Sequence, residues 1–356
     1  MYKKIFMGIA AAAALTLVSC SSDDLNSLSD NSSKNEAISF DGYWGRSAVS
    51  VNGSRGSVIN KAEDLQGLTE GFGVFGNYKN AEGLEFGSNL FNNEKVTYDA
   101  SAEPAKWTYT NTKYWPTEGH IDFLAYAPYD SKYNNQVTKD DQKLEFTVDP
   151  DFKKQKDLLW ANAKDQTKAN IVNTENKVKF QFAHALSRLG YSVKLKEAYS
   201  DATITLNKIT LAGSNDGTKE AFYSAGTIDL SKTSSEGLWT PSATKQKFDW
   251  VSSDETLNNT GINNPKTDYL FVIPQDFSKT TPGADELYVI VEYTISYSGV
   301  TTTMKSKVCK KLDRKFLQGK AYTINLTIGL TPIEFNADVT EWEIPADGAI
   351  DINTWN

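Results

Sequence analysis

Histidine is scarce in this chain, and the short motifs that usually mark catalytic or metal-binding sites are missing. Only His120 and His184 occur among 356 residues. His184 lies between Phe182 and Leu186 on an apolar face, which predicts a buried, hydrogen-bonded core residue, and His120 is expected at a loop edge. The sequence holds no nucleophile elbow, phosphate loop, HExxH motif or calcium loop, and no spacing selects a carboxylate pair. It therefore predicts no catalytic residue, no metal site, no cofactor and no enzyme.

Positive charge and long apolar runs are lacking as well. The chain carries 37 Lys and Arg against 45 Asp and Glu, a formal net charge of −8, and shows no basic stripe. A nucleic-acid partner is therefore not expected. The apolar run Ile5–Val18 is too short to span a bilayer and has the length of the hydrophobic region of a signal peptide.

The N-terminus has the pattern of a lipoprotein signal. Two lysines precede the apolar run, and Leu17-Val18-Ser19-Cys20 at its end resembles the lipobox that the lipoprotein signal peptidase reads. The Cys20 thiol would form a thioether to diacylglycerol, and acylation of the freed amine would add chains that hold the protein at a membrane. Residues 1–19 are thus expected to be a signal peptide and Cys20 the lipidation site. An ordinary secretory signal with an incidental cysteine is the alternative.

Cysteine is also scarce, because Cys20 and Cys309 are the only two. With Cys20 lipidated, Cys309 has no second cysteine to pair with, which excludes an intramolecular disulfide and a cysteine metal cluster. Cys309 ends an alternating run, and this position predicts a small buried core residue.

Residues 20–37 are rich in Ser, Asn and Asp and lack aromatic residues, which is typical of a flexible tether between a lipid and a fold. Within them, Ser21-Ser22-Asp23-Asp24 resembles the export signal that sends Bacteroidetes lipoproteins to the outer face of the outer membrane. Acidic tethers also favour solubility, so both interpretations stay open. We expect a lipid-anchored, surface-exposed protein of the outer membrane.

Alternating apolar residues dominate the chain from Ile38 onward. In 286–298 every second residue is apolar, and 178–186 and 322–330 repeat this pattern, which predicts half-buried antiparallel strands. After Leu186 the phase slips by one residue, which predicts a bulge or bend between two strand halves. At most a short helix is expected, within 152–170. The fold class is therefore predicted to be all-β.

The mature chain is longer than a single hydrophobic core usually organises, which favours two domains. The polar segment 162–176 separates two apolar runs, so we expect an N-terminal domain over 38–172 and a C-terminal domain over 173–356. Many short strands with turn residues between them are typical of β-sandwiches.

A series of short segments runs through the chain from about residue 38 to 345. The segments are Ile38-Ser39-Phe40, Gly45-Arg46-Ser47, Phe72–Gly76, Asn89–Glu94, Lys113–Pro116, Asp122–Tyr129, Asp157–Ala161, Phe182–Leu189, Gly319–Tyr322 and Val339–Trp342. In order and spacing they resemble segments of the fimbrillin-like lipoproteins of Bacteroidetes (FimA/Mfa-like), the subunits of type V pili. The resemblance implies two tandem transthyretin-like β-sandwich domains.

The resemblance also implies assembly by donor-strand exchange. In stalk subunits of the family a protease cuts after an arginine near the N-terminus and removes the first strand, and a strand of the next subunit fills the groove. Such a contact does not close on itself and propagates into a fibre. Arg46-Ser47, just after the Ile38–Phe40 strand, is the candidate processing site, and Arg55-Gly56 is a second candidate. Both arginines are alternatively solvated loop residues, and stalk, tip and anchor roles stay open.

The eight tryptophans support a second hypothesis. Surface glycan-binding lipoproteins of the same bacteria are also tandem β-sandwiches, and they stack sugars on exposed tryptophans. Core packing accounts for most of these residues, but Trp239 and Trp250 lie in polar, turn-rich surroundings and are the candidates for glycan stacking.

The sequence thus predicts a structural or adhesive pilus subunit that is exported as a lipoprotein and joins a fimbrium by strand exchange. Its expected partners are other pilus subunits, the outer membrane through lipid on Cys20, and a host or bacterial surface receptor. A cell-surface carbohydrate-binding lipoprotein for nutrient capture is the alternative.

Overall fold

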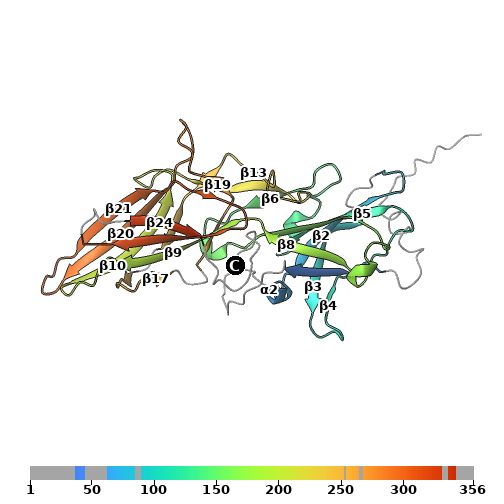
Figure 1. Cartoon of the computed structure of the whole chain (residues 1–356), viewed down its shortest axis with the longest axis horizontal. Helices are drawn as coiled ribbons and strands as arrows, with labels where there is room; N and C mark the ends of the chain where they lie inside the picture. Colours follow the sequence, from blue (N-terminus) through green and yellow to red (C-terminus); the bar gives the residue numbers. More distant parts are fainter. Residues whose placement is uncertain are drawn as a thin grey trace, which may run out of the picture.

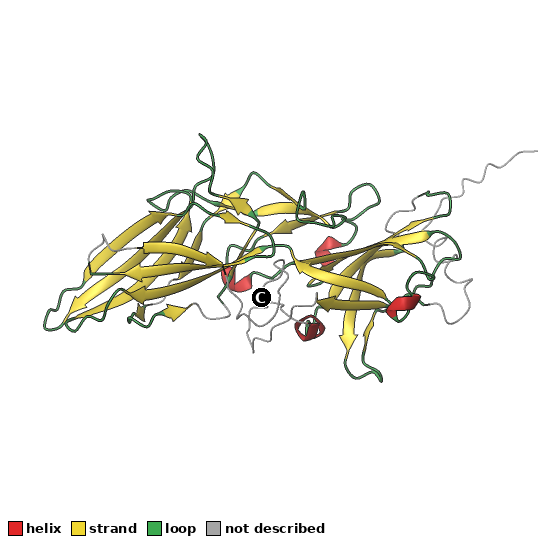
Figure 2. Ribbon diagram, viewed as in Figure 1, coloured by secondary structure: helices red, strands yellow, loops and turns green. Residues whose placement is uncertain are grey.

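The computed structural model describes residues 37–44, 62–84, 90–251, 254–263, 268–330 and 336–341. Figure 1 shows an elongated molecule with two lobes along its long axis, and Figure 2 shows that strands joined by loops build both lobes, with only short helices. The predicted all-β fold is confirmed. No helix in the described part of the chain is long and apolar enough to cross a membrane. The run Ile5–Val18 lies outside that part.

The first lobe, at the right of Figure 1, contains a seven-stranded sheet with the order β1-β8-β7-β5-β2-β3-β4. Its neighbouring strands are antiparallel, except that β1 and β8 run parallel. A short helix, α2, spans Ala62–Gln66 and contacts β1. The strands are β1 Phe40–Trp44, β2 Phe72–Lys79, β3 Phe91–Asp99, β4 Lys106–Thr108, β5 His120–Ala127, β7 Leu159–Gln166 and β8 Val178–His184.

The first strand of the chain brings the two ends of this sheet together. β1 and β4 stand at opposite ends of the strand order, yet they contact each other. Just before β1, the Ile38 N–H donates to the Lys113 carbonyl at 2.8 Å, and Ala37 forms an antiparallel bridge with Tyr114. The sheet therefore curls around one cluster of buried apolar side chains, which includes Ile38, just before β1, and Phe40 of β1.

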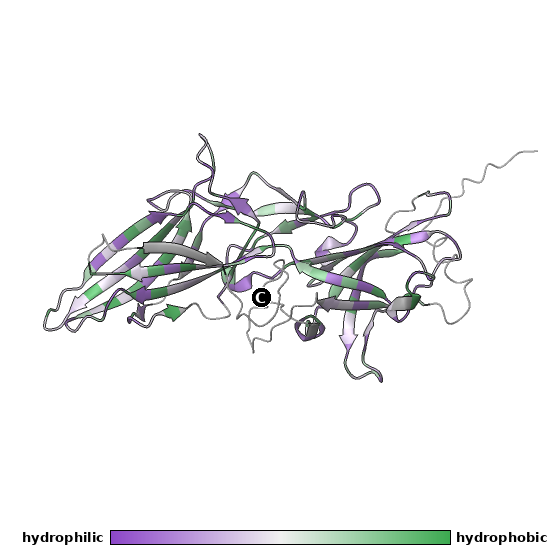
Figure 3. Ribbon diagram, viewed as in Figure 1, coloured by the Kyte–Doolittle hydropathy of each residue, from purple (hydrophilic) through white to green (hydrophobic). Residues whose placement is uncertain are grey.

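The second lobe, at the left of Figure 1, is built from two larger sheets. One has the order β15-β10-β20-β21 with β16 beside β10, and the other the order β17-β9-β23-β24 with β18 beside β9. Figure 3 shows apolar and polar residues alternating along these strands, and both sheets contribute to one cluster of buried side chains. The strands are β9 Ser187–Leu195, β10 Ala202–Ala212, β15 Phe248–Val251, β16 Glu255–Thr256, β17 Ile262–Asn263, β18 Leu270–Val272, β20 Tyr288–Tyr297, β21 Met304–Lys311, β23 Ala321–Ile328 and β24 Asn336–Glu341.

Small sheets lie between the two lobes in Figure 1. β6 (Lys143–Thr147) pairs with β12 (Ala225–Asp229), which also pairs with β13 (Trp239–Pro241). These pairings join a strand of the first half of the chain to strands of the second half. The remaining elements are β11 Phe222–Tyr223 with β14 Lys245–Gln246, β19 Gln275–Asp276 with β22 Lys315–Phe316, and single 3-10 turns at Ser131–Tyr133, Phe152–Lys154 and Val172–Thr174.

The chain passes from the first large sheet to the second between His184 and Ser187. β8 pairs with β7 in the first lobe, whereas β9 pairs with β23 in the second. The predicted boundary between residues 172 and 173 precedes β8. We propose instead that the first unit extends through β8, because its strand pairing belongs there. The transthyretin-like connectivity of the two units stays a prediction.

Two local predictions differ from the structure. The helix expected within 152–170 is only the 3-10 turn Phe152–Lys154. Residues Leu159–Gln166 form strand β7 instead, and the first three of them are buried in the core. Cys309 was expected in the core but is exposed. β21 is the last strand of its sheet, and because Val308 points into the core, the alternation of a strand turns Cys309 outward.

The prediction for His184 is confirmed. Its side chain is completely buried, and its Nδ1 lies 2.9 Å from Oδ2 of the equally buried Asp157. Burial lowers the pKa of His184, although the neighbouring Asp157 carboxylate acts in the opposite direction. The pair lies where β8 ends, beside the passage of the chain into the second lobe.

Candidate functional site

The strongest candidate for a functional site is the groove that holds β1. Alternate residues of this segment, Ile38, Phe40 and Gly42, point inward. Ile38 is 1% exposed, Phe40 is 2% exposed, and Gly42 is also buried. The residues between them face outward, and Tyr43 is 38% exposed. The segment has the alternation of a half-buried strand, with its apolar side turned into the lobe.

Phe40 lies in a ring of aromatic side chains. Its ring centroid is 5.3 Å from that of Phe91, 5.5 Å from those of Tyr109 and Phe123, and 5.7 Å from that of Phe180. The contacts with Phe91 and Phe123 are edge-to-face, a geometry that aromatic rings prefer. These four rings, which we call the seat of Phe40, come from β3, β5, β8 and the segment after β4. Strands from across the lobe thus surround one β1 side chain.

Hydrogen bonds hold the backbone of the same segment from both sides. The Val178 N–H donates to the Ser39 carbonyl at 2.8 Å, and the Tyr109 hydroxyl donates to the Ile38 carbonyl at 2.7 Å. Burial raises the pKa of Tyr109 to about 12, so its hydroxyl stays protonated and able to donate. The Ser39 hydroxyl donates to the Asn176 carbonyl at 3.1 Å. The segment is thus held by its main chain as well as by its side chains.

The Ile38–Phe40 strand was expected from the sequence, but two residues that complete its seat were not. Leu65 of α2 is fully buried and lies against Gly42 of β1, and Tyr109 bonds the Ile38 carbonyl. Both contacts join residues far apart in the chain. The acidic pair Glu63 and Asp64 in the first turn is the one local signal that indicates α2.

The predicted lipidation and processing residues lie outside the described part of the chain: Cys20, Arg46-Ser47 and the second candidate, Arg55-Gly56. Arg46 follows the last residue of β1, Trp44, by two positions in the sequence. Lipidation at Cys20 and processing at Arg46 therefore stay predictions.

The structure places both candidate glycan-stacking residues against other side chains. Trp250 is 2% exposed, packs edge-to-face on Tyr191 with ring centroids 5.0 Å apart, and donates its indole N–H to the Asp268 carbonyl at 2.9 Å. Trp239 is half-buried and donates its indole N–H to the Ala185 carbonyl at 2.7 Å. Trp250 is too deeply buried to offer its face to a sugar, and Trp239 is half-covered and held by its indole hydrogen bond.

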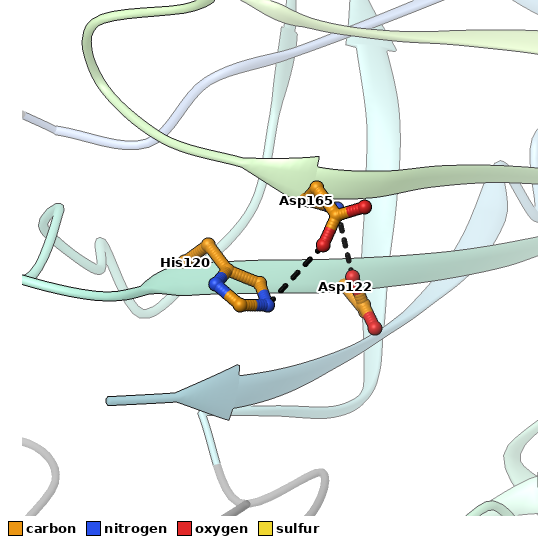
Figure 4. Close-up of side chains that lie close together, drawn as sticks. All are labelled: His120, Asp122 and Asp165. Carbon is orange, nitrogen blue, oxygen red and sulfur yellow. Dashed lines mark hydrogen bonds and ion pairs between the residues drawn. The ribbon is translucent and has the colours of Figure 1, made fainter. Parts of the chain in front are cut away.

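A second cluster, shown in Figure 4, joins His120 and Asp122 of β5 to Asp165 of β7. His120 Nε2 lies 3.3 Å from Asp165 Oδ1, and the Asp165 N–H donates to Asp122 Oδ1 at 2.7 Å. The Lys79 ammonium donates to Asp122 Oδ2 at 2.9 Å. Burial raises the pKa of Asp122, but these hydrogen bonds and the lysine charge outweigh it and hold that pKa below its ordinary value.

The arrangement does not suit a metal ion. Both oxygens of Asp122 already accept hydrogen bonds from the protein, and the Lys79 ammonium beside them would repel a cation. Asp165 has a positive φ of 55° at a register shift between β5 and β7, so the cluster pins an irregular strand pairing. We assign it a structural role.

Comparison with known proteins agrees with this architecture. The fimbrillin-like family profile matches residues 62–342. A fimbrial protein from Bacteroides vulgatus is 20% identical, over 87% of this chain and 100% of that one, with a TM-score of 0.63. The tip fimbrial protein Mfa3 from Porphyromonas gingivalis, with a C-terminal truncation, is 11% identical over 76% of this chain and 94% of that one, with a TM-score of 0.36. No curated protein matches. Because the family profile covers most of the sequence, the chain belongs to the fimbrillin-like family.

Proposed function

We propose that this protein is a pilus subunit that assembles by strand exchange at the β1 groove. The observation that carries the proposal is the position of β1. It is the first strand described, it stands at one end of its sheet order, and it supplies Ile38 and Phe40 to a core that all its neighbours share. A strand of another subunit with similar side chains would complete the same core.

Processing after Arg46 would leave β1 held only by non-covalent contacts. The chain continues from β1 to α2 through residues 45–61, which include Arg46, so a cut there removes the covalent link between β1 and the rest of the lobe. Departure of β1 would uncover the aromatic seat of Phe40 and the free edge of β8. An apolar groove beside an unpaired strand edge is the arrangement that β-strand addition uses.

If Cys20 is lipidated as predicted, cleavage after Arg46 has a second consequence. Cys20 precedes β1 in the sequence, so cleavage after Arg46 would separate the lipid from the folded lobes at the moment at which it frees β1. We propose that the precursor is held at the outer membrane through Cys20 and that processed subunits join other pilus subunits in a fimbrium. A subunit that is never cut would keep its anchor, as a tip or anchor role requires.

Brief trypsin treatment of the full-length protein tests this function. We expect cleavage after Arg46, shown by a new N-terminus at Ser47, and SDS-resistant ladders as subunits join. The matched control replaces all three basic residues between β1 and α2, as Arg46→Gln, Arg55→Gln and Lys61→Gln, which removes the cuts but leaves β1 intact, and it should stay monomeric. If the cut protein remains strictly monomeric at high concentration, the stalk role is contradicted.

The N-terminus of material shed from the cell surface tests the lipid anchor. A start at Ser47 identifies a processed pilin, whereas an acylated Cys20 identifies a retained lipoprotein. A start elsewhere, with an unmodified Cys20, would contradict the anchor.

A further inference from the structure

The groove has little room at one of its three inward positions. An ideal Cβ built on Gly42 would lie 3.0 Å from Cδ2 of Leu65, 3.3 Å from Cε2 of Phe182 and 3.5 Å from Cε1 of Phe72. The first two distances are tighter than nine in ten real Cβ contacts. Even an alanine would therefore press on its neighbours, and a branched side chain would need them to move.

Lack of space for a side chain, and not an unusual backbone conformation, explains why position 42 is a glycine. Nine glycines in the described part of the chain have a positive φ, as at Gly71 and Gly119, but Gly42 is not among them. It lies within β1 and pairs in regular parallel register with Phe180 of β8. Any residue could adopt this strand conformation, so what excludes a side chain is the packing above it.

The atoms that fill this space belong to rigid parts of the lobe. Leu65, Phe72 and Phe182 are buried, with at most 2% of each side chain exposed, and they come from α2, β2 and β8. The Phe72 ring is itself fixed by edge-to-face contacts with Phe182 at 5.4 Å and with Trp107 at 4.9 Å. Since buried side chains at normal packing density have little freedom, they yield to a larger neighbour only at a cost.

We infer that the groove selects its incoming strand by three alternate residues: a branched aliphatic residue in place of Ile38, an aromatic one in place of Phe40, and glycine in place of Gly42. The partner is a strand of another pilus subunit with this pattern, lying parallel to β8. This inference rests on the proposed function and adds a specificity rule to it: Leu65 and Phe182 reject strands with a side chain at the third position. The outward positions, such as Asp41 and Tyr43, carry little of the selection.

Peptide exchange into the full-length protein nicked after Arg46 tests the rule. Labelled peptides of residues 37–46 would be added in excess, and their uptake in place of the resident strand followed by fluorescence anisotropy. The test peptide carries Gly42→Val. The matched control carries Asp41→Val, which adds the same side chain at the neighbouring outward position.

We expect the native and Asp41→Val peptides to exchange with similar affinity and the Gly42→Val peptide to bind about 5- to 150-fold more weakly, the range that overpacking a core produces. Leu65→Ala in the protein should restore most of the binding of the Gly42→Val peptide. Equal binding of all three peptides would overturn the specificity rule and leave strand exchange standing. Failure of the native peptide to exchange would instead overturn strand exchange itself. A Gly42→Val peptide that stays weak with Leu65→Ala would overturn the role given to Leu65.

Discussion

The substitution Phe40→Ala is the most direct test of the β1 seat. Phe40 is 2% exposed and contacts four aromatic rings, so its truncation leaves a cavity that the surrounding rings fill only in part. Removing a buried phenylalanine in this way typically costs about 3–5 kcal/mol of folding free energy. Because β1 is the first strand of the lobe, we expect most of that cost to appear as easier opening of β1 and of its partner β8.

Hydrogen exchange measured by mass spectrometry resolves where the cost falls. A loss of about 3–5 kcal/mol in the free energy of opening corresponds to an increase of roughly 140- to 4,000-fold in the exchange of β1 and β8 amides. Amides of β23 lie in the other lobe and serve as the internal reference, with unchanged protection. Tyr43→Ala, at the exposed position of the same strand, is the control variant and should change the free energy by less than about 0.5 kcal/mol.

The result that refutes this reasoning is equally specific. If Phe40→Ala and Tyr43→Ala lower the protection of β8 by the same amount, the alternate burial of β1 does not determine its stability. If Phe40→Ala lowers protection equally in β8 and β23, the two lobes unfold together and β1 is not a separable element. In either case the proposed exchange would lose its structural basis.

Four further predictions concern other parts of the molecule. Asp157→Ala should cost about 1–3 kcal/mol in urea unfolding because it removes the buried carboxylate that the neutral His184 imidazole hydrogen-bonds. Burial lowers the pKa of His184 below 6.5, so the unfolded chain binds this proton at a higher pH than the folded chain does. The free energy of unfolding should therefore fall as the pH drops from 6.5 to 5, by at most about 1.4 kcal/mol per pH unit. His184→Gln should flatten this slope, and an unchanged slope would contradict the assignment to His184. Trp250→Ala should cost about 3–5 kcal/mol in guanidinium unfolding, whereas an exposed sugar-stacking residue would cost almost nothing. Excess zinc should leave the Tm unchanged, and a rise that His120→Ala abolishes would show that the cluster of Figure 4 binds metal.

Much of the fold follows from a local rule. A strand that is buried on one face repeats every two residues, and this period alone identifies β20, β23 and β8 within a few residues of their observed ends. The Ile38–Phe40 strand was expected from the resemblance to the fimbrillin-like lipoproteins and not from this period. The periodic inference needs no knowledge of what packs on the other side of these strands.

What the local rule misses is the identity of the neighbours. The phase slip after Leu186 predicted a bulge or bend between two strand halves, but the structure places these halves, β8 and β9, in different sheets. The Tyr109 hydroxyl bonds a carbonyl 71 residues earlier in the chain, and Leu65 closes over Gly42 from a helix of five residues. Contacts of this kind depend on the three-dimensional arrangement, which the spacing of residue types in one sequence does not encode.

The topology of the first lobe explains why loss of β1 would open a site and not unravel the sheet. β8 keeps its other partner, β7, through the pairs Leu159 with His184 and Trp160 with Ala183, so the remaining strands stay linked from β8 to β4. What changes is confined to the place of β1: β8 gains unpaired N–H and C=O groups, and the seat of Phe40 faces water. Both defects are corrected together by one extended strand, since its main chain pairs with β8 while its alternate side chains fill the seat. A single apolar ligand would correct only the second defect, which is why the groove favours a strand over any smaller partner.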